Sequence, residues 1–324
     1  MTDSFRMRNI LLIFAVALAM TAGAQNLRRA TRVTLPATPR SVQFSPSGQQ
    51  VAVLAGDDKL RLINLPSGQV LLAVDAQDKR RITAFAYSGD GRWLAVGDRA
   101  GAVSLIDSRS GSVAKKWTAA EKGIDTLVLS ADGSKLAVGA GDLPGRVWDT
   151  ASEPALRLTT HPEFGGLTSA AFSSDAHLLL TADGDTVVRL YDVNSGKKLA
   201  SNRDLLLESF GTAFIPDGHY AVVGGADPAI LFFDPATGKT KRKLGSHPGV
   251  VDSITAAPDG KHLIVTYFDA TGLTKPMPIL YWDIATEKSQ VISDGKGVIG
   301  CGVAKDQIWV ATAKDNTLEL WRWE

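Results

Sequence analysis

Residues 172–199 read FSSDAHLLLTADGDTVVRLYDVNSGKKL. Short apolar runs at 178–180 and 187–191 follow Phe172, and the positions between them are filled by Asp, Gly, Asn and Ser. Short apolar runs separated by turn-forming residues are typical of antiparallel strands joined by tight hairpins. Because the same phrase recurs along the chain, the repeat decides the fold before any single segment does.

A turn residue after the first strand of each copy sets the register of the repeat. The copies place Gly48, Gly91, Gly133, Ala176, Gly218 and Gly260 at this position. Fifteen residues later stand Ile63, Ile106, Trp148, Tyr191 and Phe233. Trp282 follows Gly260 by twenty-two residues, which indicates an insertion of seven in the sixth copy. A spacing of about 42 residues predicts a four-stranded propeller blade rather than a helical repeat.

A seventh, degenerate copy ends the chain and is expected to close the ring. Residues 297–305, 307–314 and 317–324 predict three strands, and residues 32–35 are predicted to supply the fourth. We therefore expect an all-β, seven-bladed β-propeller with four antiparallel strands per blade, closed by an N-terminal strand that completes the last blade. Six blades without this closure remain the alternative.

Residues 27–324 resemble the WD40 family and the lactonase-like (YVTN-type) seven-bladed propellers of bacteria. The literal Trp-Asp dipeptide stands at Trp148-Asp149 and Trp282-Asp283, whereas Leu62-Ile63-Asn64 is closer to the lactonase-like pattern. WD40 blades contain a buried hydrogen-bond network of His, Ser or Thr, Asp and Trp. The resemblance implies such a tetrad in blade six at His247, Thr266, Asp269 and Trp282, and a partial one in blade four at His161, Thr181, Asp183 and Tyr191.

The N-terminus predicts a cleaved secretory signal peptide over residues 1–24. A basic start at Arg8 precedes an apolar run over 10–20, and Ala22-Gly23-Ala24 supplies small residues for cleavage. The run is shorter than the roughly 18 apolar residues of a membrane span. We therefore expect a single propeller domain over 25–324 in the bacterial periplasm or medium, without integral membrane association after cleavage. An uncleaved interfacial anchor is the alternative, and Met1 and Met7 both remain candidate initiators.

Charge and cysteine content narrow the partners that the chain could have. The chain has 35 basic and 34 acidic residues, and removal of the leader leaves 33 of each. This balance argues against a nucleic-acid partner, because phosphate binding needs an excess of positive charge. The basic cluster within 239–243 is interpreted as the solvated face of an outer strand.

Cys301 is the single cysteine of the chain. Without a partner for an internal disulfide, it is expected to be a small buried side chain, and the protein is expected to be monomeric.

The sequence shows no catalytic, cofactor-binding or metal-binding motif, and no cofactor is predicted. Three histidines follow the first hairpin turn of successive copies, so they should lie a blade width apart: His177, His219 and His262. No zinc-ligand spacing or nucleophile elbow occurs. Spacing cannot detect residues that converge on a propeller channel, so a lactonase-like hydrolase with a site in that channel stays open as the alternative function.

Two departures from the repeat predict where a protein or peptide partner binds. The inter-blade loop 203–208 carries Leu205, Leu206 and Leu207, and the blade-six insertion carries Tyr267, Phe268, Leu273 and Met277. Apolar residues on loops of a rigid ring suggest a contact surface. In the alternative, the leucines pack inward and the insertion only covers the channel. We interpret the chain as an exported, non-catalytic protein–protein interaction or scaffolding module of the envelope.

Overall fold

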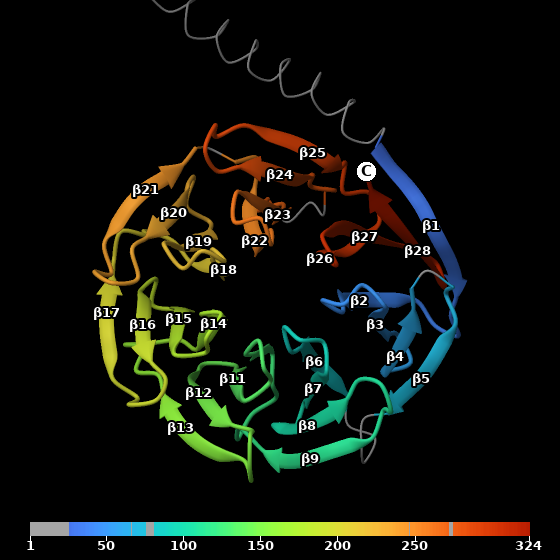
Figure 1. The fold of residues 1–324 in the computed structure, drawn as a ribbon, viewed down its shortest axis with the longest axis horizontal. Helices are drawn as coiled ribbons and strands as arrows, with labels where there is room; N and C mark the ends of the chain where they lie inside the picture. Colours follow the sequence, from blue (N-terminus) through green and yellow to red (C-terminus); the bar gives the residue numbers. More distant parts are fainter. Residues whose placement is uncertain (1–25, 66, 76–80, 246, 272–274) are drawn as a thin grey trace, which may run out of the picture.

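The computed structural model describes residues 26–65, 67–75, 81–245, 247–271 and 275–324. These residues form a ring of seven four-stranded antiparallel sheets around a central channel (Figure 1), and they contain no α-helix. The predicted all-β, seven-bladed propeller is therefore confirmed. In the described part of the chain, no helix is long and apolar enough to cross a bilayer.

Each blade runs from an inner strand beside the channel to an outer strand at the rim. Blades 1 to 3 consist of β2 (Pro39–Phe44), β3 (Gln50–Ala55), β4 (Lys59–Asn64) and β5 (Val70–Asp75); β6 (Ile82–Tyr87), β7 (Trp93–Asp98), β8 (Ala102–Asp107) and β9 (Val113–Thr118); and β10 (Thr126–Leu129), β11 (Lys135–Ala140), β12 (Leu143–Asp149) and β13 (Ala155–Thr159). Blades 4 to 6 consist of β14 (Leu167–Phe172), β15 (Leu178–Asp183), β16 (Val188–Asp192) and β17 (Lys198–Asn202); β18 (Ser209–Phe214), β19 (Ala221–Gly225), β20 (Ile230–Phe233) and β21 (Thr240–Leu244); and β22 (Val250–Ala256), β23 (His262–Phe268), β24 (Ile279–Asp283) and β25 (Ser289–Ser293).

The seventh blade joins the two ends of the described chain. It consists of β26 (Val298–Ala304), β27 (Gln307–Lys314), β28 (Thr317–Trp323) and, outermost, β1 (Leu27–Thr34). β1 pairs with β28 from Leu27 opposite Trp323 to Thr34 opposite Thr317. The predicted closure is confirmed, and the closing strand is longer than residues 32–35 because its pairing continues along the whole of β28.

The turn residues that set the repeat occupy left-handed backbone conformations. Gly48 has a φ of 68° and Gly218 a φ of 75°, and Ala176 adopts the same conformation at 59°. Glycine accepts positive φ without steric cost, and alanine does not. The fourth blade therefore keeps the turn geometry despite losing the glycine, which explains why the register of the repeat continues through it.

The hydrophobic core lies between the blades and not within them. Each of seven buried clusters draws its residues from two neighbouring blades, as where Leu60 and Leu62 of blade 1 pack with Leu94 and Ile106 of blade 2. A single blade would leave both faces of its sheet exposed. Burial of one such aliphatic side chain contributes about 1.5–3 kcal/mol, so each blade depends on both neighbours for its stability.

Candidate binding face

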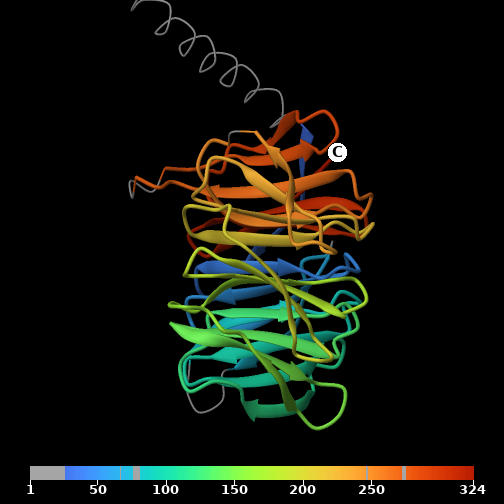
Figure 2. The same ribbon diagram turned by 90° about the vertical axis from the view of Figure 1, so that its left-hand side faces the viewer.

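The topology places two kinds of loop on one face of the ring. In an antiparallel meander, the turn between the second and third strands emerges at the same end as the connection to the next blade. We call this end the connection face. It carries the loop 203–208 between β17 and β18 and the segment after β23, which extends beyond the ring in Figure 2.

The three leucines of the loop 203–208 separate into one core residue and two surface residues. Leu205 is buried with Leu180 and Leu231 in the cluster between blades 4 and 5. Leu206 is 81% exposed and Leu207 is 49% exposed. Their backbone N–H groups donate to the carboxylate of Asp227, at 3.1 and 2.9 Å to Oδ2. The loop is thus held in place while two leucine side chains face solvent.

The neighbouring inter-blade loop contributes an exposed aromatic residue that the sequence analysis missed. Phe164, between β13 and β14, is 65% exposed. An ion pair between Arg203 and Glu163 links this loop to the leucine loop, and Thr168 Oγ1 donates to the Ser209 carbonyl at 2.7 Å. The available signal was an aromatic residue in an inter-blade loop, which breaks the repeat as the leucines do.

On the blade-six side, the predicted residues again divide between core and surface. Tyr267 is buried, whereas Phe268 is 39% exposed and packs edge-on against Phe210, with ring centroids 5.6 Å apart. Met277 is half-buried, and Leu273 lies outside the described residues. We define the apolar patch as the partly or fully exposed side chains that blades 4 to 6 place on the connection face: Phe164, Leu206, Leu207, Phe210 and Phe268.

The four side chains proposed as a WD40 tetrad do not form one hydrogen-bond network among the described contacts. Trp282 Nε1 donates to the Tyr267 hydroxyl at 3.0 Å. His247 stacks on Tyr267, its Nδ1 lies 2.6 Å from the Gly249 carbonyl, and burial lowers its pKa. Thr266 contacts Ser253 and Asp252 instead, while Asp269 is only partly exposed and accepts hydrogen bonds from Thr271. In blade 6, the Tyr267 hydroxyl thus accepts the hydrogen bond from the Trp282 indole, and within the described part of the chain none of the other three expected tetrad residues does.

Blade 4 contains a buried ionic network that no motif search revealed. Arg189 Nη1 donates to Asp183 at 3.0 Å and to Asp185 at 2.9 Å, and Thr181 donates to Asp183 at 3.1 Å. Burial raises the pKa of Asp183 to about 6. Against the effect of burial, hydrogen bonds from Arg189 lower the pKa of Asp185. The ring of His161 does not join this network; only its backbone N–H contacts Tyr191.

The same Asp-x-x-x-Arg pair recurs in blade 1. Arg61 is buried and donates to both carboxylate oxygens of Asp57, at 2.9 and 2.5 Å. Asp57 and Asp185 each stand nine residues after the turn residue of their copy, at Gly48 and Ala176. This recurrence was visible in the sequence and is the signal that could have predicted the network. The pair fastens the turn between the second and third strands to its own sheet.

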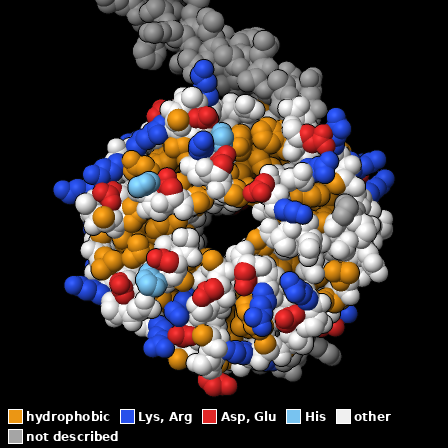
Figure 3. Space-filling view, in the orientation of Figure 1, with side chains coloured by type: hydrophobic (Ala, Val, Ile, Leu, Met, Phe, Trp, Pro, Cys, Tyr) orange, Lys and Arg blue, Asp and Glu red, His pale blue; other side chains and the backbone are white. Residues whose placement is uncertain are grey.

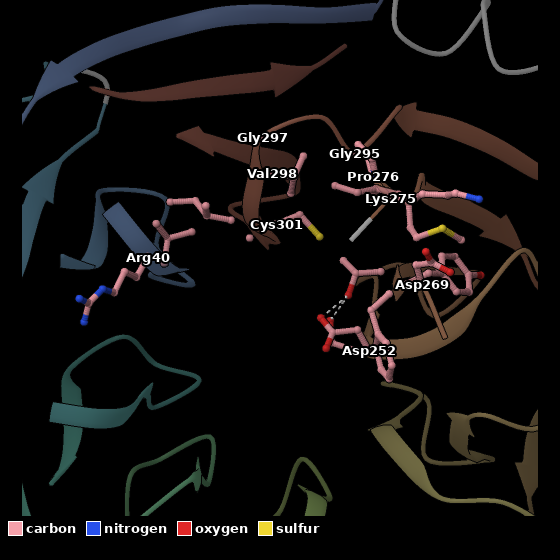
Figure 4. Close-up of a pocket in the computed structure, with 18 residues that line it drawn as sticks. Arg40, Asp252, Asp269, Lys275, Pro276, Gly295, Gly297, Val298 and Cys301 are labelled. Atoms are coloured by element: carbon pink, nitrogen blue, oxygen red, sulfur yellow. Dashed lines mark hydrogen bonds between the residues drawn. The ribbon is translucent and has the colours of Figure 1, made fainter. Parts of the chain in front are cut away.

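The central channel is visible as an opening through the ring (Figure 3), and a cavity of about 790 Å³ lies beside it between blades 6 and 7. Figure 4 shows Asp252 at one edge of this cavity and Cys301 on the opposite wall. Burial raises the pKa of the Cys301 thiol to about 12, with a further contribution from the Asp252 charge. The thiol is therefore protonated at neutral pH. Among the described residues, no group of three or more His, Cys, Asp or Glu could hold a metal ion.

A family model for the N-terminal domain of nucleolar protein 10-like proteins, a β-propeller, matches residues 24–240. The chain belongs to this family. Together with the blade geometry, the match identifies the fold as a WD40-type seven-bladed propeller. The comparisons do not support the lactonase-like subtype of bacteria.

The chain is also similar to individual proteins at 27–28% identity. Transducin beta-like protein 3 of Bos taurus is 28% identical over 200 residues, covering 60% of this chain and 24% of that protein. WD repeat-containing protein SL1-17 of Schistosoma mansoni is 27% identical over 157 residues, covering 48% of this chain and 51% of that protein. The serine-threonine kinase receptor-associated protein of Mus musculus is 27% identical over 141 residues, covering 43% of this chain and 39% of that protein. The aligned part of the chain thus spans between about a quarter and a half of the length of these relatives.

The family match corrects one prediction from the sequence. The periplasmic or secreted location is contradicted, because the matching family is described as nucleolar protein 10-like. That expectation rested on the composition of residues 1–24, which lie outside the described residues. An apolar run after a basic start indicates a membrane-targeting segment only by composition, and the propeller that follows carries no information about compartment.

Proposed function

We propose that this propeller is a protein-interaction module whose recognition surface is the apolar patch on the connection face. The observation that carries the proposal is the exposure of Leu206, Leu207 and Phe164 on adjacent loops that are tied to each other and to the ring. Exposed aromatic and aliphatic side chains on a rigid support bind protein surfaces at small conformational cost.

The surface chemistry supports a protein partner. The chain as a whole carries 35 basic and 34 acidic residues, so no excess of positive charge is available to bind phosphates. The relatives include a serine-threonine kinase receptor-associated protein, whose name describes association with another protein. A ring with several loops on one face suits this role, since each blade can contribute a side chain to a shared contact.

The experiment replaces Leu206 and Leu207 with serine and leaves the buried Leu205 unchanged. The tagged full-length double variant and wild type are used to purify bound proteins from cells that express the chain naturally. We expect at least a tenfold loss of the co-purifying protein from the double variant. The direct contact is then verified by binding of the purified partner to the purified chain.

Leu156 and Leu199 provide the matched control, because both are 48% exposed but lie on the outer strands β13 and β17. Their replacement with serine removes the same number of exposed leucines away from the connection face. Equal loss of the partner in the two double variants, or no loss in either, would show that the apolar patch is not the recognition surface.

A further inference from the structure

At one register position of the inner strands, blades 2, 4 and 5 contact the blade that follows them. This position lies four residues before Tyr87, Phe172 and Phe214 in blades 2, 4 and 5. Thr83 donates to the carbonyl of Ile124 in blade 3, and Thr168 donates to that of Ser209 in blade 5. Phe210 packs against Phe268 in blade 6. These contacts close the boundary between neighbouring inner strands.

In blade 6 this position is Asp252, which makes no such contact. Its carboxylate accepts a hydrogen bond from Thr266 of its own blade at 3.2 Å. On β26, Cys301 lines the same cavity.

The carboxylate of Asp252 lacks a cationic partner within the described structure. No described Lys, Arg or His lies within salt-bridge distance of it. Of the two cations that line the cavity, Arg40 pairs with Asp58 at 3.2 Å, and its guanidinium points away from the cavity in Figure 4. The ammonium of Lys275 also points away from Asp252 in Figure 4, and its charge contributes to the lowered pKa of Asp269.

Apart from a second carboxylate at Asp269, the rest of the cavity wall is apolar or carries hydroxyl groups. Met277, Val298 and Ile299 line it, and the hydroxyls of Ser253 and Thr266 lie 2.9 Å apart near the carboxylate. An alkyl chain of three or four carbons ending in a cation matches these walls, because each buried methylene contributes about 0.8 kcal/mol. The charged end would reach an acceptor carboxylate, and the hydroxyl oxygens could accept its remaining hydrogen bonds.

We propose that the cavity between blades 6 and 7 receives a lysine or arginine side chain of a protein partner, with its charged group at Asp252. The inference rests on the proposed function, since it assigns one contact of the interaction module. Binding to the apolar patch does not require a basic residue in the partner. Binding to this cavity does, in the segment of the partner that crosses the channel mouth.

The test measures binding of fluorescein-labelled pentapeptides to the full chain by fluorescence anisotropy. The probes are Gly-Leu-Lys-Leu-Gly and its versions with norleucine, acetyl-lysine or arginine at the third position. We expect the lysine and arginine probes to bind at least fivefold more tightly than the norleucine and acetyl-lysine probes. In D252N this difference should fall below twofold, while D269N, which removes the partly exposed second carboxylate of the same cavity, should retain it.

Equal binding of the lysine and norleucine probes by wild type, or an unchanged preference in D252N, would overturn the proposal. The Leu206 and Leu207 double variant should keep the lysine preference, which separates failure of this inference from failure of the apolar patch.

Discussion

At the scale of single residues, the least expected feature is the pairing of two carboxylates with one guanidinium in blade 4. Arg189, Asp183 and Asp185 are all buried, and Asp183 Oδ1 has no hydrogen-bond partner. One cation cannot fully compensate two buried anions, so one carboxyl group binds a proton more readily than it would in water. Asp183 is that group, because Asp185 receives the two-pronged contact from Arg189.

This network predicts a pH dependence of stability. The pKa of Asp183 is raised to about 6 from 3.8 in the unfolded chain, so the folded protein binds the proton more tightly. Its charge therefore destabilises the fold above pH 6, and this cost is relieved as pH falls through 6 toward 3.8. Between pH 7.5 and 5, urea unfolding should show wild type gaining on the order of 1 kcal/mol relative to D183N. Parallel pH dependence of wild type and D183N would contradict this prediction, and D269N serves as a control at a partly exposed carboxylate outside the network.

At the scale of elements, the loop between β17 and β18 directs three consecutive leucines into different environments. The carboxylate of Asp227 accepts hydrogen bonds from the backbone N–H groups of Leu206 and Leu207. These bonds fix the path of the loop as it passes from blade 4 to blade 5. That path directs Leu205 into the core between blades 4 and 5 and the next two side chains toward solvent. A cluster of three leucines in a sequence does not reveal this division, because the path of the backbone decides it.

The division predicts unequal effects of serine substitution along the loop. Leu205→Ser should lower the free energy of unfolding by about 2–4 kcal/mol, since it leaves a cavity and buries a hydroxyl group. Leu206→Ser should change it by less than about 0.5 kcal/mol. Urea unfolding of both single variants checks this expectation. Comparable destabilisation by the two changes would mean that the loop packs differently from the structure described here.

At the scale of the whole molecule, stability depends on ring closure by β1. Seven clusters between blades form a closed circuit, and β1 contributes Val33 to the cluster that joins blades 7 and 1. It also covers the hydrogen-bonding edge of β28 along its whole length. Loss of this strand would expose both an apolar boundary and an unpaired edge, which favours unfolding and association with other chains.

Deletion of residues 27–34 should therefore lower the Tm by more than about 10 °C, since one large cluster and one complete strand pairing are lost together. A synthetic peptide of residues 26–35, added in excess, should restore most of the loss because it can pair with β28 in trans. The same peptide carrying Val33→Asp should not restore it. An unchanged Tm after deletion would show that β1 does not hold the ring closed.

The amino-acid sequence by itself determined the fold of this protein. Turn residues at a constant spacing, with apolar runs between them, predicted seven four-stranded blades and the closing strand, because blade geometry repeats with local chain length. The tertiary structure alone decided which loop leucines are exposed, that Trp282 bonds to Tyr267, and that Asp252 has no cation beside it. These features depend on side chains from neighbouring blades or distant strands. The spacing of residues in the sequence does not show which side chains of two neighbouring blades face each other.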